Sequence, residues 1–282
     1  MKPEAIKDFY MINGEMRSTT DVEIFEKIEK PPIYEVIRVI GGVPLFLEDH
    51  LSRMAESAHI VNYEIERKPE DIEADMKSLI IKNRIHNLNI KLLCTDVEGM
   101  GQVFLVYFID SFYPPEKYYK SGIHTILLHY ERKNPNAKAL INSFKEEVAR
   151  TLEEKEAFEA LLVNREGYIP EGSRSNIFFV KGEKVYTAPK GDVLLGITRK
   201  HIVDICEKLG IKIIEENIHV DDLEKLDGAF MSGTSVNVLP ITSVDHIELG
   251  SVNNKIIKKI NNTYVDRMRN YINAKNLEWK EK

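Results

Sequence analysis

Apolar and polar residues follow two different periods along the first part of the chain. The run Ile33–Ile40 (IYEVIRVI) is rich in β-branched residues and ends at Gly41-Gly42, which predicts a strand with Val43–Leu47 as its hairpin partner. In Leu47–Ala58 apolar residues recur at helical spacing, so a helix is predicted there. The further predicted elements are a hairpin around Asn13-Gly14, a helix from Lys68 to Arg84, and strands at Asn87–Cys94 and Gln102–Ile109. This part is therefore predicted to form a small α/β unit.

The second part of the chain alternates strands with helices of different lengths. The pattern predicts a long helix from Leu140 to Ala157 and a C-terminal amphipathic helix from Val252 to Ile272, which we interpret as a packing element. Other predicted elements are strands at Ile123–His129, Ala160–Asn164, Asn176–Val180, Glu183–Ala188, Ile211–Glu215 and Ala229–Met231, and helices at Arg199–Leu209 and Asp221–Leu226.

A segment rich in proline and aromatic residues separates the two parts. Asp110–Gly122 holds two prolines and four aromatic residues, which is typical of a linker between domains. Chains of 282 residues are also long enough for two cores. The predicted domains are residues 1–115 and 123–282, joined by a linker at 116–122.

Composition excludes several classes of protein. With 43% hydrophobic and 30% charged residues the chain is an ordinary globular protein, and its net charge of −6 without a dense basic patch argues against a nucleic-acid partner. Cys94 and Cys206 lie in apolar runs without metal-ligand spacing, so we expect buried thiols and no metal site. No run reaches the ~18 apolar residues of a membrane span, and the first residues lack a signal-peptide pattern. We therefore expect a cytoplasmic protein with no membrane partner.

One carboxylate occupies the turn between two apolar runs. Glu171 lies in YIPEGSRSNIFFV, Tyr168–Val180, where proline, glycine and serines favour a turn with exposed backbone donors. A carboxylate held at a strand end can face a bound ligand. The alternative is a solvated loop residue.

Four further features carry candidate chemistry. Arg53 lies on a different side of its helix from the apolar residues, and Lys138 lies near the start of the long helix; the plain alternative for each is a solvated side chain. Gly196 precedes a helix whose first N–H groups can bind an anion. The loop Ser232–Ser235 offers N–H and hydroxyl donors, or is simply a polar turn. Together these features meet the needs of pyridoxal phosphate, which requires an amine, an anion at its ring nitrogen and a phosphate pocket.

The sequence also resembles the class IV, or fold type IV, pyridoxal-phosphate enzymes over nearly its whole length. These include branched-chain and D-amino-acid aminotransferases and aminodeoxychorismate lyase. The motifs that carry the resemblance are YEVIRV, LEDHLSR, AKALIN, GYIPEGSRSNIFFV, LLGITR, FMSGTS and VLPITSVD. The resemblance implies an α+β fold of two domains, a small α/β N-terminal domain and a larger C-terminal domain with a mixed, barrel-like sheet. It also implies a homodimer.

The resemblance assigns a role to each candidate. Lys138 looks like the lysine that forms the Schiff base and moves the substrate's proton, and Glu171 looks like the partner of the ring nitrogen. The expected phosphate ligands are Arg53, Gly196, Ile197, Thr198 and Thr234. The expected substrate-side residues are Tyr34, Arg38, Arg174 and Ser235.

Departures from the family pattern concern the substrate. Lys30–Pro32 replaces a glycine-rich segment, Ser143 stands where branched-chain enzymes commonly have a tyrosine, and the hairpin TDVEGMG lacks an arginine found in several relatives. Carboxylate recognition is therefore expected to involve Arg38 or Arg174.

Three hypotheses remain open from the sequence. The first, favoured by the spacing of Lys138 and Asn142 and by FMSGTS, is an aminotransferase that moves an amino group from a hydrophobic amino acid to a 2-oxo acid, with a D-amino-acid enzyme as a variant. The second is a lyase of the aminodeoxychorismate type. The third is a cofactor-binding protein without activity.

Overall fold

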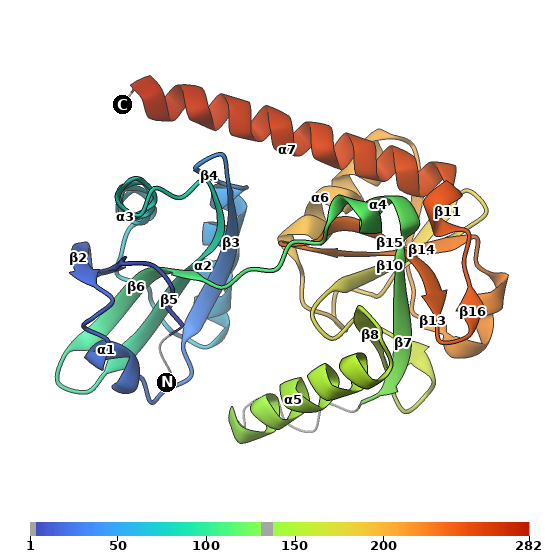
Figure 1. The fold of residues 1–282 in the computed structure, drawn as a ribbon, viewed down its shortest axis with the longest axis horizontal. Helices are drawn as coiled ribbons and strands as arrows, with labels where there is room; N and C mark the ends of the chain where they lie inside the picture. Colours follow the sequence, from blue (N-terminus) through green and yellow to red (C-terminus); the bar gives the residue numbers. More distant parts are fainter. Residues whose placement is uncertain (1–3, 131–137, 282) are drawn as a thin grey trace. The chain divides into compact units, whose positions relative to one another are not determined.

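The computed structural model describes residues 4–130 and 138–281, without the side chains of 138–143 and 279–281 (Figure 1). The chain forms two compact units, one of residues 1–112 with 268–282 and the other of residues 113–267. Helix α4 (Glu116–Ser121) lies where the sequence analysis placed the linker. The last residues belong to the first unit, whereas the predicted C-terminal domain included them.

The first unit is built on an antiparallel sheet with the strand order β2-β1-β6-β5-β3-β4. Asn13 and Gly14 both have positive φ, 48° and 88°, as a tight hairpin turn requires, so the predicted hairpin is confirmed. The strands are β1 (Phe9–Ile12), β2 (Glu15–Ser18), β3 (Ile33–Ile40), β4 (Val43–Pro44), β5 (Asn87–Val97) and β6 (Gly101–Ile109).

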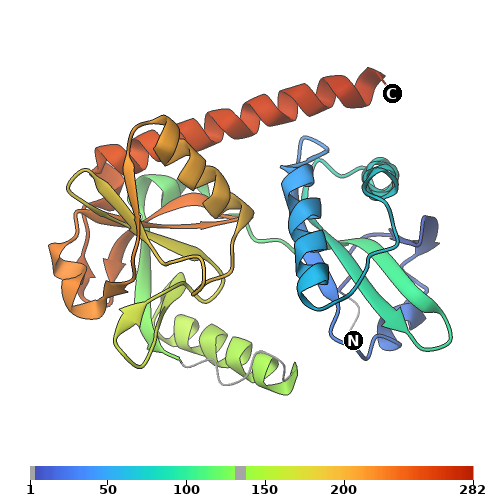
Figure 2. The same ribbon diagram turned by 180° about the vertical axis from the view of Figure 1, so that it is seen from behind.

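Helices cover this sheet on both faces. Helix α2 (Leu47–Ile60) lies behind β3 in Figure 1 and in front of the sheet in Figure 2, and α3 (Pro69–Lys82) contributes to the same apolar core. Alternate residues of β3, such as Ile37 and Val39, face this core. On the opposite face the short helix α1 (Glu23–Glu26) buries Phe25 against Tyr10 and Tyr107.

The second unit contains a mixed sheet in the order β12-β11-β10-β14-β15-β7-β8, with β16 paired to β15 and a separate pair β13-β9. The strands are β7 (Ile123–His129), β8 (Glu159–Val163), β9 (Tyr168–Ile169), β10 (Asn176–Lys181), β11 (Lys184–Thr187), β12 (Lys212–Glu215), β13 (Ile218–His219), β14 (Gly228–Gly233), β15 (Asn237–Val244) and β16 (Ile247–Glu248).

Strand β15 was not predicted, because its sequence NVLPITSV contains a proline and loop-forming residues. The structure explains how the strand accepts Pro240. The residue pairs with Phe230 of β14, and pairing with β7 begins only at Ile241. At Pro240 the strand is therefore unpaired on its β7 side, so the missing N–H removes no hydrogen bond to β7.

Helices α5 (Lys138–Glu154) and α6 (Ile197–Lys208) accompany this sheet. Helix α5 lies along β7 and β8 in both ribbon views, and Val148 packs with Ile126 and Ala160. Two short helical turns, η1 (Val220–Lys225) and η2 (Ser251–Asn253), complete the unit. The predicted two-domain α+β architecture is confirmed.

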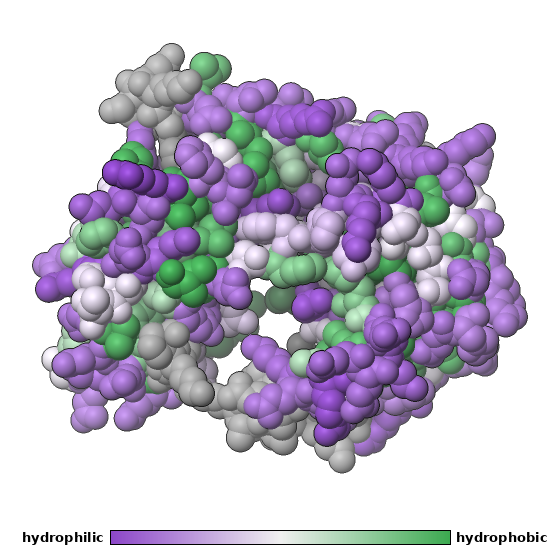
Figure 3. All heavy atoms as spheres, viewed as in Figure 1, coloured by the Kyte–Doolittle hydropathy of each residue, from purple (hydrophilic) through white to green (hydrophobic). Residues whose placement is uncertain are grey.

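The C-terminal helix α7 (Lys255–Glu281) is a packing element at both of its ends. Ile260 and Tyr264 are buried in the second unit, and Tyr271 contacts Phe46 in the first unit with 5.1 Å between ring centroids. Hydrophilic residues cover most of the surface seen in Figure 3, with hydrophobic residues interspersed among them.

Candidate functional site

Two loops of the second unit meet at one end of its sheet. Strand β10 starts at Asn176 and the antiparallel β14 ends at Gly233, with Asn176 opposite Ser232. The loop that contains Glu171 and the loop that contains Thr234 are therefore neighbours. Their backbones approach closely, since a Cβ added to Gly233 would lie 3.9 Å from the carbonyl oxygen of Arg174.

The side chain of Asn176 connects these loops to the start of α6. Its Nδ2 donates to the carbonyl oxygen of Leu194 at 2.8 Å. A Cβ on Gly196 would lie 2.4 Å from Asn176 Oδ1, so only glycine allows this approach. Gly196 is the residue before the helix, and no side-chain cap is found there among the described residues, so the first N–H groups, those of Ile197 and Thr198 among them, can donate to an anion.

A buried hydroxyl lies beside Asn176. Ser232 is only 1% exposed, and its Oγ has no hydrogen-bond partner among the residues that the structure describes. The sequence analysis included Ser232 in this hydroxyl-rich loop but assigned individual roles only to Thr234 and Ser235. A buried hydroxyl without a partner among the described residues calls for an explanation, such as a bound polar group. Thr234 and Ser235 are half-buried.

Glu171 is half-buried, which agrees better with a ligand-facing residue than with a fully solvated loop. Its backbone is held on two sides. The carbonyl oxygen of Glu171 accepts the N–H of Leu162 in β8 at 2.9 Å, and Glu171 forms a β-bridge with Asn176.

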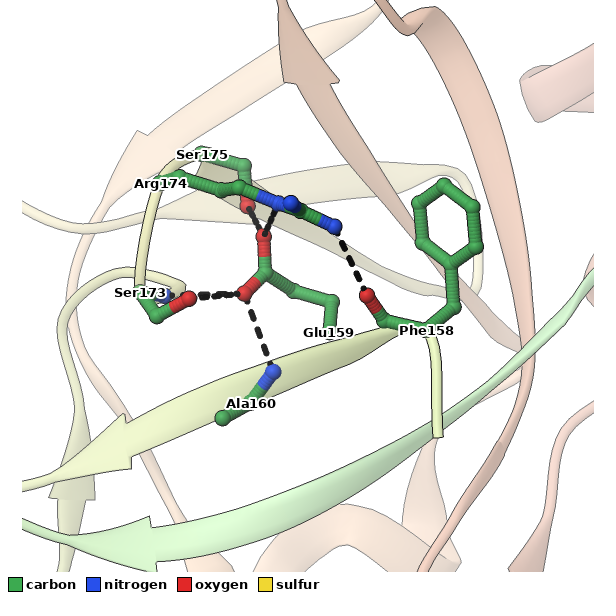
Figure 4. A network of polar contacts seen from close by, with 6 residues as sticks. All are labelled: Phe158, Glu159, Ala160, Ser173, Arg174 and Ser175. Atoms are coloured by element: carbon green, nitrogen blue, oxygen red, sulfur yellow. Dashed lines mark hydrogen bonds and ion pairs between the residues drawn. The ribbon is translucent and has the colours of Figure 1, made fainter. Parts of the chain in front are cut away.

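Glu159, which the sequence analysis did not single out, is a fully buried carboxylate beneath the same loop (Figure 4). It accepts hydrogen bonds from Ser173 and Ser175. Arg174 also belongs to this network: its Nη2 donates to the carbonyl oxygen of Phe158 at 3.0 Å and its Nε lies 3.7 Å from Glu159 Oε2. The guanidinium expected to bind substrate is thus engaged with its own loop, and its substrate role stays a prediction.

Lys138 is the first residue of α5, so the helix starts two residues before the predicted position and includes the lysine. Its side chain lies outside the described part of the chain. Its chemical role therefore stays a prediction.

Three of the expected site residues belong to the first unit, and Arg53 is the most constrained of them. Its Nε and Nη2 donate to the two oxygens of Glu35 on β3 at 2.7 and 2.6 Å. His50 Nδ1 lies 2.8 Å from Glu35 Oε2. Arg53 is therefore not the solvated helical arginine of the alternative interpretation.

Burial and hydrogen bonding have opposite effects on the pKa of Glu35. Burial by itself raises the pKa of Glu35, but hydrogen bonds from His50 and Arg53 outweigh it and leave the pKa below its usual value. Burial lowers the pKa of His50 despite the nearby carboxylate. Glu35 thus stays ionised and fixes the orientation of Arg53.

Tyr34 and Arg38 lie on β3 in the first unit, on the sheet face opposite to Glu35. Tyr34 is 56% exposed, and the Nζ of Lys91 lies 4.9 Å from the centre of its ring. Lys91 lies on the neighbouring strand β5 and is also ion-paired with Glu4.

Comparison with known proteins identifies the family. The family described as Amino-transferase class IV matches residues 32–244, which is most of the chain. The chain belongs to the class IV aminotransferases. The resemblance inferred from the motifs, and the expectation of an enzyme of this kind, are both confirmed.

Several aminotransferases are similar to this class IV chain. D-alanine aminotransferase of Bacillus licheniformis is 29% identical over 231 residues, covering 78% of this chain and 81% of the relative. The branched-chain-amino-acid aminotransferase of Pseudomonas aeruginosa is 29% identical over 244 residues, covering 78% of each chain. The solved branched-chain amino acid aminotransferase of Escherichia coli matches with a TM-score of 0.82 at 23% identity, covering 93% of this chain and 95% of that structure, and so shares the fold.

No helix within the described residues is long and apolar enough to cross a membrane. Among the same residues, no group of three or more histidine, cysteine, aspartate or glutamate side chains could hold a metal ion.

Proposed function

We propose that this class IV aminotransferase uses pyridoxal phosphate to move an amino group from a hydrophobic amino acid to a 2-oxo acid. The observation that supports the cofactor most directly is the meeting of three segments at one end of β10 and β14. These are the loop of Glu171, the uncapped start of α6, and the loop that follows the unpartnered hydroxyl of Ser232. They offer an anion for a ring nitrogen beside N–H and hydroxyl donors for a phosphate, so the residues fit the group.

When bound, the cofactor supplies an aldehyde that condenses with amines and a ring that accepts the electron pair left at the substrate's Cα. Lys138 holds the cofactor through its amine and, once released, moves the proton at that Cα. Glu171 keeps the ring nitrogen protonated by accepting its hydrogen bond. The N–H groups of Ile197 and Thr198 and the hydroxyls of Thr234 and Ser232 would bind the phosphate. The N–H of Gly196 donates to the carbonyl oxygen of Leu194 at 2.9 Å, so Gly196 would contribute through its backbone conformation. The guanidinium of Arg53 is proposed as a further phosphate ligand.

The amino donor is proposed to be apolar, as the name of the Pseudomonas aeruginosa relative suggests. The test is a panel of L- and D-amino acids assayed against 2-oxoglutarate and pyruvate. Turnover of branched-chain L-amino acids with 2-oxoglutarate is expected. Turnover of D-alanine alone would instead favour the second candidate, a D-amino-acid aminotransferase, which the Bacillus licheniformis relative supports. Pyruvate release without an acceptor would indicate a lyase, and cofactor binding without turnover would indicate an inactive protein.

Arg53 is predicted to contribute to cofactor affinity beyond its structural ion pair. Arg53→Ala should weaken cofactor binding by about tenfold to a hundredfold, since a charge-assisted hydrogen bond is worth roughly 1.5 to 3 kcal/mol. The dissociation constant can be measured by fluorescence titration of protein stripped of cofactor. The substitution also leaves Glu35 buried without its cation, which costs roughly 3 kcal/mol of unfolding free energy.

Arg67→Ala is a matched control for that loss of stability. Arg67 donates to the buried Asp75 at 2.6 Å, and the exposed fractions of the two arginine side chains are 20% for Arg67 and 21% for Arg53. Both variants should lose stability, and Arg53→Ala alone should lose cofactor affinity. Equal affinities in the two variants would contradict the phosphate role.

We further propose a homodimer, as the resemblance to the family implies, with the small-molecule substrates as its other partners. A cytoplasmic location is proposed as well, as expected from the sequence analysis. Sedimentation of the wild-type protein across a range of concentrations tests the assembly. A monomer with full activity would contradict it.

A further inference from the structure

We propose that Glu159 is the positioning residue for Glu171, through a set of hydrogen bonds that fixes the loop between β9 and β10. This inference rests on the proposed role of Glu171 and adds a residue that acts through it. Glu159 is the first residue of β8 and is 0% exposed, so it cannot act as a surface acid.

Both oxygens of Glu159 are surrounded by donors (Figure 4). Oε1 accepts the N–H of Ala160 at 2.9 Å, the N–H of Ser173 at 3.1 Å and the hydroxyl of Ser173 at 2.5 Å. Oε2 accepts the hydroxyl of Ser175 at 3.0 Å and lies 3.7 Å from Nε of Arg174. A buried carboxylate needs hydrogen-bond donors, and the described residues supply donors to both of its oxygens.

Most of these donors belong to the residues that directly follow Glu171. The loop also forms two backbone hydrogen bonds with the part of β8 that follows Glu159. Leu162 donates to the carbonyl of Glu171 at 2.9 Å, and Ser173 donates to the carbonyl of Ala160 at 2.8 Å. Glu171 is therefore placed between a backbone contact and the loop residues that Glu159 holds.

The glycine after Glu171 shows how closely the loop fits over Glu159. A Cβ on Gly172 would lie 2.3 Å from Ser175 Oγ and 3.2 Å from the carboxyl carbon of Glu159. A side chain at this position would displace the Ser175 hydroxyl that donates to Glu159 and would crowd the carboxylate itself. The sequence E-G-S-R-S at 171–175 is thus adapted to a carboxylate beneath it.

The far end of the loop extends the effect to the second part of the site. Asn176 follows Ser175 directly, and its side chain holds the carbonyl of Leu194 just before α6. A shift of the loop would therefore move both Glu171 and the segment that leads to the expected phosphate site. Glu159 reaches neither group itself, so its contribution is one of position.

Glu159→Gln tests the inference in the full-length protein. The amide is nearly isosteric but directs N–H groups at the donors of the serine side chains. Hydrogen exchange of the amides from Glu171 to Asn176 should accelerate by about tenfold or more. With cofactor bound, kcat per bound cofactor should fall about tenfold while KM for the amino donor changes less than twofold, because Glu159 is predicted to touch neither substrate nor cofactor.

Two further variants provide a control and an alternative to Glu159→Gln. Asp75→Asn removes another buried, ion-paired carboxylate, which lies in the first unit, and should leave exchange in the loop unchanged. If Glu159→Gln does not fold, the double variant Ser173→Ala with Ser175→Ala removes the hydroxyl donors and keeps the carboxylate. It should accelerate exchange in the loop by roughly threefold or more.

The inference would be overturned if the loop amides of a folded Glu159→Gln variant, or of the double serine variant, exchanged hydrogen at the wild-type rate. Failure of the proposed function can be distinguished from failure of this inference. A wild-type protein without transamination would remove the role of Glu171 as ring partner, but the exchange measurement on the loop would still report whether Glu159 fixes it.

Discussion

Replacing Lys138 by alanine is expected to abolish transamination, with a loss on the order of a thousandfold or more. The same amine is proposed to hold the cofactor and to move the proton at the substrate's Cα, and proton transfer by a positioned group alone is worth about a hundredfold to ten-thousandfold. The purified wild-type protein should be yellow, and its absorption band should shift when an amino donor is added. Lys138→Ala should lack both the band and the shift.

A lysine two turns along the same helix provides the control for Lys138. Lys145 is exposed on α5, and Lys145→Ala should keep the band, the shift and the activity. Borohydride reduction followed by peptide mapping should place the trapped cofactor on Lys138. A trapped adduct on any other lysine, or an unchanged spectrum in Lys138→Ala, would disprove the assignment.

Glu171→Gln is expected to lower kcat by about a hundredfold while the fold and most of the cofactor affinity remain. The amide has nearly the same shape, so the backbone bonds of the loop should persist, but a neutral side chain no longer keeps the ring nitrogen protonated. If that contact contributes about 3 kcal/mol in the transition state, the rate falls by about two decades at ~1.4 kcal/mol each. Steady-state kinetics at saturating donor, with cofactor content measured separately, would show it.

The control for Glu171 is another glutamate on the preceding turn. Glu166 is exposed, and Glu166→Gln should change kcat less than twofold. Turnover of Glu171→Gln within about twofold of wild type would leave less than ~0.5 kcal/mol for the contact. Glu171 would then be a loop residue and not part of the active site.

Local patterns were sufficient for most of the elements. The β-branched residues of IYEVIRVI predicted β3 at the residues where it is observed, and Asn13-Gly14 predicted the first hairpin, because each signal depends on a few neighbouring residues. Strand β15 was not predicted from its local sequence. Its proline lies where β7 is not yet paired, since pairing with β7 begins at Ile241, and this is a property of the sheet and not of the segment.

The sequence by itself determined the family and the candidate residues, since motifs such as GYIPEGSRSNIFFV preserve the order of chemical groups along the chain. The tertiary structure alone decided how those groups are supported. The ion pair of Arg53 with Glu35 joins a helix to a strand, and the link from Asn176 to Leu194 joins the start of β10 to a loop. Glu159 is buried beneath serines that follow it by fourteen residues and more. Such contacts depend on the packing of segments that are distant in sequence, so no local period or propensity predicts them.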